Sequence, residues 1–174
     1  RIWYMARRQG LTMPYPVNVQ IQHHSATPFR RPDASAGERL AQIPHIPRVP
    51  EVEKAGTRTL TYGKGELIFD EGQMLAGVYL VVSGAVSMRL VQRGQVAEIA
   101  TVGPGDFFGE AGMHGSQAAE TRAVAMEDTE VLLLGPDTVR RLFEASPMLA
   151  RNTGQVLDVR RKALQSARAA FRRR

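Results

Sequence analysis

Glycines separate short apolar stretches between residues 57 and 134, and this pattern constrains the fold more than any other feature of the sequence. Within the stretches apolar and polar residues mostly alternate, which is typical of strands with one buried face. The predicted strands span residues 58–62, 67–69, 78–83, 85–91, 95–102, 121–126 and 130–134. Many short strands of this kind predict a mainly β fold, an antiparallel β-roll or small barrel. The predicted core comprises Leu67, Phe69, Tyr79, Val81, Val86, Ile99, Phe107, Phe108, Val131 and Leu133.

Helices are predicted after residue 135. Pro136 suits the first position of a helix that continues over residues 138–145, and a long helix is predicted over residues 148–171. Leu157 and Leu164 lie seven residues apart on this helix, so one of its faces is apolar. That face must cover the roll, a bound ligand or another subunit.

The 174 residues suffice for one domain with appendages. Five of the 10 prolines fall within residues 22–50, a composition typical of a semi-rigid linker. We therefore predict three parts: residues 1–21 end another domain, residues 22–50 form the linker, and residues 51–174 form the β-roll with its C-terminal helix. Residues 40–49 are expected to pack onto the roll.

The net charge is distributed unevenly along the chain. It is +4 over residues 1–54, −5 over residues 55–150 and +7 over residues 151–174. An anion bound in the acidic middle must therefore be held by local donors. The absence of cysteine excludes disulfides and thiolate metal sites. No nucleophile, acid–base pair or metal-ligand spacing stands out, so we predict neither an enzyme nor a metal site.

One stretch combines several features of a ligand site. Five glycines fall between residues 103 and 115, and Glu110 directly follows Gly109. If a short helix begins there, its unpaired N–H groups attract an anion, and Glu110 can accept hydrogen bonds from a hydroxyl. Together these groups would suit a sugar phosphate. Tight turns at a corner of the roll are the alternative explanation for the glycines.

The order of these turns resembles that of the cyclic nucleotide-binding domain family. The resemblance covers residues 57–165 and depends on the glycine turns of residues 63–72, on Gly84 and Gly105, on residues 108–110 and on the turn at residues 127–130. It implies that cyclic AMP or cyclic GMP is the candidate ligand, that Glu110 binds the ribose 2′-hydroxyl, that backbone N–H groups bind the phosphate and that the last helix acts as a lid. The implied ligand-binding residues are Phe108, Gly109, Glu110, Ala111, Gly112, Ala119, Glu120 and Thr121, and the implied lid residues are Leu157, Arg160, Arg161 and Leu164.

The sequence departs from this family at one position. Family members have a Pro-Arg-Ser/Thr-Ala step whose arginine pairs with the phosphate, and the ungapped register places residues 118–121 there. Ala119 replaces the arginine and Glu120 replaces its neighbour. Arg122 lies three residues beyond Ala119, and on a strand this odd offset points a side chain to the opposite face. The sequence therefore predicts weak or absent cyclic nucleotide binding.

Residues 1–21 resemble the end of the cytoplasmic domain of the small-conductance mechanosensitive channel family. A helix end stopped by Gly10 leads through Pro14 and Pro16 into alternating apolar residues over 17–21. The resemblance implies a homo-oligomer, a heptamer, whose parent chain lies in a bacterial inner membrane with this region in the cytoplasm. A proline-rich arm unrelated to channels is the alternative.

Together, the two resemblances indicate the cytoplasmic regulatory region of a cyclic nucleotide-gated-like bacterial channel. The alternative is a transcription regulator or signalling module that lacks its DNA-binding part. Specific nucleic acid binding is not expected, because the chain ends where a DNA-reading motif would begin. The basic residues 172–174 fit either a solvated helix end or contact with anionic lipid.

Overall fold

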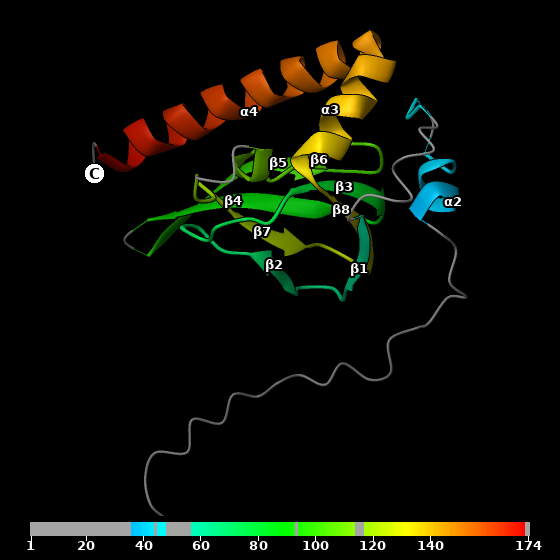
Figure 1. Ribbon diagram of the computed structural model, residues 1–174. Coiled ribbons are helices and arrows are strands. Elements are labelled where there is room, and N and C mark those ends of the chain that lie inside the picture. Colours follow the sequence, from blue (N-terminus) through cyan, green and yellow to red (C-terminus); the bar gives the residue numbers. More distant parts are fainter. Residues whose placement is uncertain (1–35, 44, 48–56, 93, 114–116, 173–174) are drawn as a thin grey trace, which may run out of the picture.

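The computed structural model describes residues 36–43, 45–47, 57–92, 94–113 and 117–172. Two antiparallel four-stranded sheets enclose a common core, and the helices lie against this β-roll (Figure 1). The mainly β fold with C-terminal helices that the sequence predicts is therefore confirmed.

The first sheet has the strand order β1-β8-β3-β6 and the second has the order β2-β7-β4-β5. The first consists of β1 (Arg58–Tyr62), β8 (Thr129–Leu134), β3 (Val78–Ser83) and β6 (Phe107–Phe108). The second consists of β2 (Leu67–Phe69), β7 (Arg122–Ala125), β4 (Val86–Gln92) and β5 (Gln95–Val102). A short 3₁₀ helix, η2 (Glu110–Met113), follows β6.

Strand β8 is buried on both faces. Val131 and Leu133 belong to the cluster between the two sheets, whereas Leu132 and Leu134 belong to a second cluster on the outer face of the first sheet. Successive side chains of a strand point to opposite faces, so a continuous apolar run suits a strand that is covered on both sides.

The predicted strands that correspond to β1–β5, β7 and β8 agree with the structure to within one residue at each end. Strand β6 was not predicted, because two residues are too few to show a period. Leu67 was predicted in the core but is 46% exposed. The β2–β7 register shifts between Leu67 and Phe69, so Ile68 and Phe69 are both buried and the alternation fails there.

Ile99 was also predicted in the core but is only partly buried. In the β4–β5 ladder, Met88 pairs with Ala100 and Arg89 pairs with Glu98, which leaves Ile99 without a partner. This irregularity accounts for its partial exposure.

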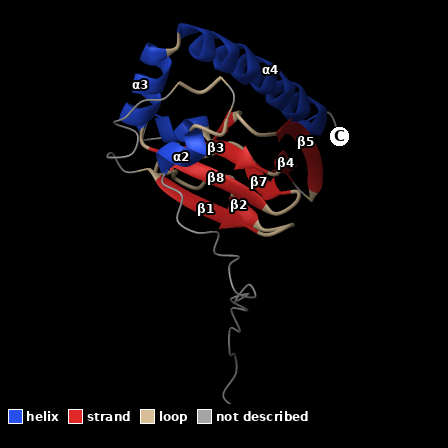
Figure 2. Ribbon diagram, turned by 90° about the vertical axis from the view of Figure 1, so that its right-hand side faces the viewer, coloured by secondary structure: helices blue, strands red, loops and turns tan. Residues whose placement is uncertain are grey.

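Two helices follow the roll. Pro136 begins α3 (Pro136–Ala145), as predicted, and α4 (Pro147–Arg172) follows directly. Helix α4 crosses the roll and lies against β4 and β5, as Figures 1 and 2 show from two sides. None of the described helices is both long and apolar enough to cross a membrane.

The segment before the roll packs against the outer face of the first sheet. Helix α2 (Ala36–Leu40) begins it, and Leu40, Ile43 and Ile46 are buried in the outer cluster. Arg39 forms an ion pair with Glu130 of β8, and both side chains are nearly buried.

This packing shows that part of the predicted linker belongs to the folded domain. Residues 22–50 are predicted to form a semi-rigid linker, yet Leu40, Ile43 and Ile46 are buried against the roll, which agrees with the packing expected for residues 40–49 where the structure describes them. The predicted strand and helix end of residues 1–21 lie outside the described residues, as do residues 22–35, 44 and 48–50 of the linker. The predicted boundaries at residues 21 and 50 stay predictions.

The anchoring of this segment predicts a loss of stability on Ile43→Ala. Ile43 is 5% exposed, and truncating a buried isoleucine leaves a cavity, so the free energy of unfolding should fall by about 2–5 kcal/mol. Urea unfolding followed by circular dichroism measures this. Gln42→Ala, at an exposed neighbour, is the matched control and should change stability by less than about 0.5 kcal/mol. Equal effects of the two substitutions would show that the segment does not pack as described.

Candidate functional site

The candidate site is built on an aromatic floor. The rings of Phe69, Tyr79 and Phe108 lie 5.1–5.9 Å apart between centroids. Gly109 follows with a φ of 73°, a conformation that favours glycine. A Cβ on Gly109 would lie 2.9 Å from Tyr79 Cδ2. The backbone at Gly109 therefore lies directly against the aromatic rings, which only a residue without a side chain allows.

A second close approach fixes η2. A Cβ on Gly112 would lie 2.0 Å from the carbonyl oxygen of Gly77, so the two backbones are in contact. The Gly112 N–H also donates to the Gly109 carbonyl, at 3.0 Å. This places Glu110 exposed at the start of η2 and Ala111 half-buried beside it. The short helix predicted after Gly109 is thus present as a single 3₁₀ turn.

The facing wall is the segment of residues 117–121. The Ala119 N–H donates to the Gln73 carbonyl at 2.9 Å, and the Ala119 carbonyl accepts from the Gly72 N–H at 2.8 Å. Ala119 is 5% exposed. These bonds hold the backbone of the wall against the turn that follows β2.

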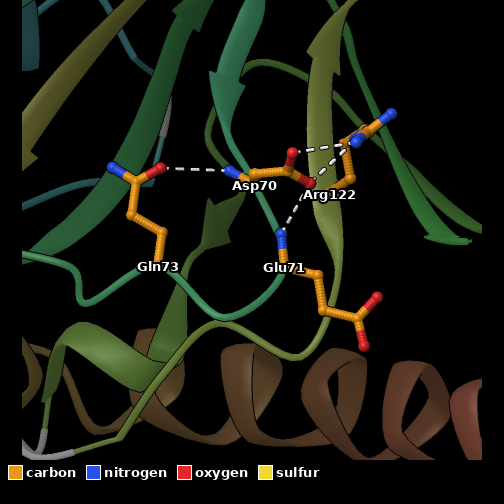
Figure 3. A network of polar contacts seen from close by, with 4 residues as sticks. All are labelled: Asp70, Glu71, Gln73 and Arg122. Atoms are coloured by element: carbon orange, nitrogen blue, oxygen red, sulfur yellow. Dashed lines mark hydrogen bonds and ion pairs between the residues drawn. The ribbon is translucent and has the colours of Figure 1, made fainter.

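Arg122 does not take part in the site. Its Nε and Nη2 donate to the two carboxylate oxygens of Asp70, each at 2.8 Å (Figure 3). The Glu71 N–H donates to the same carboxylate, and the Asp70 N–H donates to Gln73. The hydrogen bonds from Arg122 lower the pKa of Asp70 below its usual value. Arg122 therefore anchors the turn after β2, and it is absent from the cavity lining, in agreement with the opposite-face direction that its odd offset from Ala119 predicts.

Helix α4 covers the site. Leu164 is 7% exposed and reaches the site between two arginines of the same helix face, Arg160 and Arg168. Arg160 is 6% exposed, donates to the Phe107 carbonyl and lies 3.8 Å from the Asp106 carboxylate. Burial lowers the pKa of the Arg160 guanidinium, and the nearby carboxylates oppose this shift. Arg160 therefore fixes α4 to the backbone just before η2.

Between floor, wall, η2 and α4 lies a cavity of about 80 Å³. It is lined by Phe69, Leu75, Met88, Gly109, Glu110, Ala111, Gln117, Ala118, Ala119, Glu120, Thr121 and Leu164. Two carboxylates are among these described lining residues, and no arginine, lysine or histidine is. The lining can accept hydrogen bonds from hydroxyl or amino groups, but it offers no side-chain cation to an anion.

The structure brings together Gly109, Glu110, Ala111, Ala119, Glu120, Thr121 and Leu164 of the residues predicted from the sequence. It does not place Phe108 and Gly112 in the lining, since Phe108 is fully buried in the floor and Gly112 lies against Gly77. Leu157 is half-buried on α4 away from the cavity lining, and Arg161 is exposed and paired with Asp158.

Several lining residues were not predicted from the sequence. Phe69, Leu75 and Met88 come from three separate segments and have the pattern of ordinary core residues, so no local signal distinguished them. Ala118 belongs to the step of residues 118–121 but was not named as a ligand-binding residue, and Gln117 directly precedes that step. Arg168 is not in the lining but pairs with Glu120 at its edge, and this contact was not predicted, although the spacing of four from Leu164 places Arg168 on the same helix face.

Comparisons with known proteins agree with the fold described above. The family model described as "Cyclic nucleotide-binding domain" matches residues 59–146. A cyclic AMP receptor protein of Thermus thermophilus is 36% identical over 97 residues, which cover 55% of this chain and 45% of that protein. The crystal structure of the Thermus thermophilus catabolite activator protein superposes with a TM-score of 0.51 at 31% identity and covers 66% of this chain and 53% of that one.

A second relative matches a longer part of the chain. A putative potassium channel protein of Rhodopseudomonas palustris is 27% identical over 156 residues, which cover 87% of this chain and 38% of that protein. The chain spans less than half the length of these two curated relatives.

The buried arginine of α4 generates a prediction. Arg160→Gln shortens the side chain and removes its hydrogen bond to the Phe107 carbonyl, so the free energy of unfolding should fall by about 1–3 kcal/mol. Hydrogen exchange of α4 amides should rise with it. Arg161→Gln is the control, because Arg161 pairs with Asp158 on the surface and its loss should cost less than about 0.5 kcal/mol. Indistinguishable unfolding curves for the two variants would contradict the anchoring role.

Proposed function

Since the chain belongs to the cyclic nucleotide-binding domain family, we propose that it is the regulatory region of a larger bacterial protein, a cyclic nucleotide-gated-like ion channel related to the mechanosensitive channels. Its pocket binds cyclic AMP or cyclic GMP weakly or not at all. In this proposal the region lies in the cytoplasm, the parent chain lies in the inner membrane, and the copies assemble into a homo-oligomer, a heptamer by the resemblance of residues 1–21.

One observation carries the binding part of the proposal. Ala119 lies in the wall of the cavity, and no cationic side chain is among the described lining residues. A hydrogen bond between a guanidinium and a phosphate contributes about 1.5–3 kcal/mol, so its absence weakens binding by roughly ten- to more than a hundredfold. The carboxylate of Glu120 weakens it further, because it repels a phosphate.

The length of one match favours a channel as the parent. The potassium channel relative aligns with 87% of this chain, well beyond the residues that match the family model. The cyclic AMP receptor relative aligns with 55%. The resemblance of residues 1–21 to a mechanosensitive channel also favours a channel as the parent protein.

A transcription regulator is the second candidate. The higher identity, 36%, belongs to the cyclic AMP receptor protein. Helix α4 also carries basic side chains such as Arg151, Lys162 and Arg172 on its exposed surface, which would make non-specific contacts with phosphates. We rank it second because its match covers less of the chain.

The proposed mechanism is a shift of α4. A ligand or partner that binds differently to two positions of α4 changes the balance between them. The shift reaches the segment of residues 36–47 through Phe107, whose carbonyl accepts from Arg160 and whose side chain belongs to the same cluster as Ile43. That segment connects the roll to the residues that precede it.

Restoring the missing cation tests the binding proposal. Ala119→Arg should bind cyclic AMP at least about tenfold more tightly than the wild type in isothermal titration calorimetry, because it returns a guanidinium to the wall. Arg140→Gln is the control and should leave affinity unchanged, since Arg140 pairs with Asp137 on the surface of α3 outside the lining. A low-micromolar dissociation constant for the wild type would contradict the proposal.

The size of the parent protein separates the two candidates. Purified in detergent, a channel parent should elute as a large homo-oligomer, measured by light scattering. A monomeric parent would rule out the channel. A parent that needs no detergent and prefers one DNA sequence over others would instead support the regulator.

A further inference from the structure

Three residues of α4 face the roll at intervals of four: Arg160, Leu164 and Arg168. This spacing places them on one face of the helix. Arg160 binds the Phe107 carbonyl at one side of the cavity, and Leu164 lines the cavity itself. At the other side, Nη1 of Arg168 lies 3.2 Å from Oε1 of Glu120. The helix is thus attached on both sides of the pocket.

Glu120 occupies a special position in this arrangement. It lines the cavity and directly follows Ala119, the residue that stands where the family has its phosphate-binding arginine. A negative charge therefore already lies beside the place where a phosphate would bind, and its partner is a cation on the lid.

The arginines around the pocket all have partners among the described residues. Arg122 binds Asp70 with two hydrogen bonds, and Arg160 is buried against Phe107 and Asp106. Arg168 differs from both, because its side chain is 32% exposed and that of its partner Glu120 is 61% exposed. Water and ions reach this pair, so it can exchange partners without unfolding the domain.

The cavity beneath the pair is too small for a nucleotide. Its volume of about 80 Å³ is well below the roughly 300 Å³ at which small-molecule sites begin. In this proposal a nucleotide enters when the C-terminal half of α4 moves off the roll. That movement separates Arg168 from Glu120.

We propose that the carboxylate of Glu120 takes the place of a ligand's phosphate. It binds Arg168, and this pair holds α4 over the cavity. The same carboxylate repels a phosphate and so excludes it from this place. We call Glu120 and Arg168 the latch. This proposal rests on the proposed function, because it concerns the same pocket, and it names Glu120 as the residue that selects against phosphate ligands. The latch makes a contact within the chain in place of the contact that a ligand would make.

The expected effect of breaking the latch is small, because the side chains of Glu120 and Arg168 are accessible to solvent. Ion pairs at the surface are weak and screened by salt, so breaking the latch should raise the population of open α4 about two- to fivefold at low ionic strength. Arg160 keeps its hydrogen bond to the Phe107 carbonyl, so the N-terminal part of α4 and the rest of the domain should remain folded.

The first test needs no ligand. Hydrogen exchange followed by mass spectrometry should show Glu120→Gln and Arg168→Gln each raising exchange in residues 161–172 about two- to fivefold. The exchanged pair, Glu120→Arg with Arg168→Glu, should return exchange toward the wild-type rate. Asp137→Asn is the matched control, since it breaks the exposed pair with Arg140 on α3 and should leave α4 unchanged. Unchanged exchange in both single variants, or no restoration in the exchanged pair, would overturn the latch.

The second test asks whether Glu120 excludes phosphates. Calorimetry with cyclic AMP should show Glu120→Gln binding about tenfold or more tightly than the wild type, because it frees Arg168 for the phosphate. Adding Arg168→Gln should remove this gain. A gain that survives the second substitution, or no gain at all, would overturn the proposal. Low-micromolar binding by the wild type would contradict the proposed function instead, while the exchange experiment would still decide whether the latch forms.

Discussion

The position of α4 depends on one buried guanidinium. Arg160 is 6% exposed, and its hydrogen bond to the Phe107 carbonyl fastens the helix to the backbone just before η2. Burying a charged group is costly unless it is hydrogen-bonded, so this contact is specific to one placement of the helix. The coverage of the cavity by Leu164 and the pairing of Arg168 with Glu120 follow from that placement.

The uneven charge distribution along the chain suits the packing of α4 on the roll. The roll is acidic and the last helix is basic, and α4 brings basic side chains to carboxylates of the roll: Arg160 to Asp106 and Arg168 to Glu120. The positive charge that the wall lacks at Ala119 therefore reaches the pocket region from a different element. The guanidinium groups of Arg160 and Arg168 are already paired with carboxylates, so the side chains that line the cavity remain acidic.

Much of the fold was predictable because strands and helices leave periodic patterns in the sequence. The direction of the Arg122 side chain, away from the cavity lining, was also predictable, since it depends only on the register of one strand. Leu67 and Ile99 were misplaced because an irregular ladder breaks the alternation and leaves no local sign. The pair between Glu120 and Arg168 was not predicted, because it depends on how α4 crosses the roll 48 residues later in the chain.

Phe107 is shared by two elements that do not follow each other in the sequence. Its carbonyl accepts from Arg160 of α4, while its side chain packs in the cluster that holds Leu40 and Ile43. Energetic coupling between two sites is reciprocal in equilibrium binding. Phe107 therefore links the placement of α4 to that of the segment that carries Leu40 and Ile43, and a ligand that changes one placement changes the other with a coupling free energy that is equal in both directions.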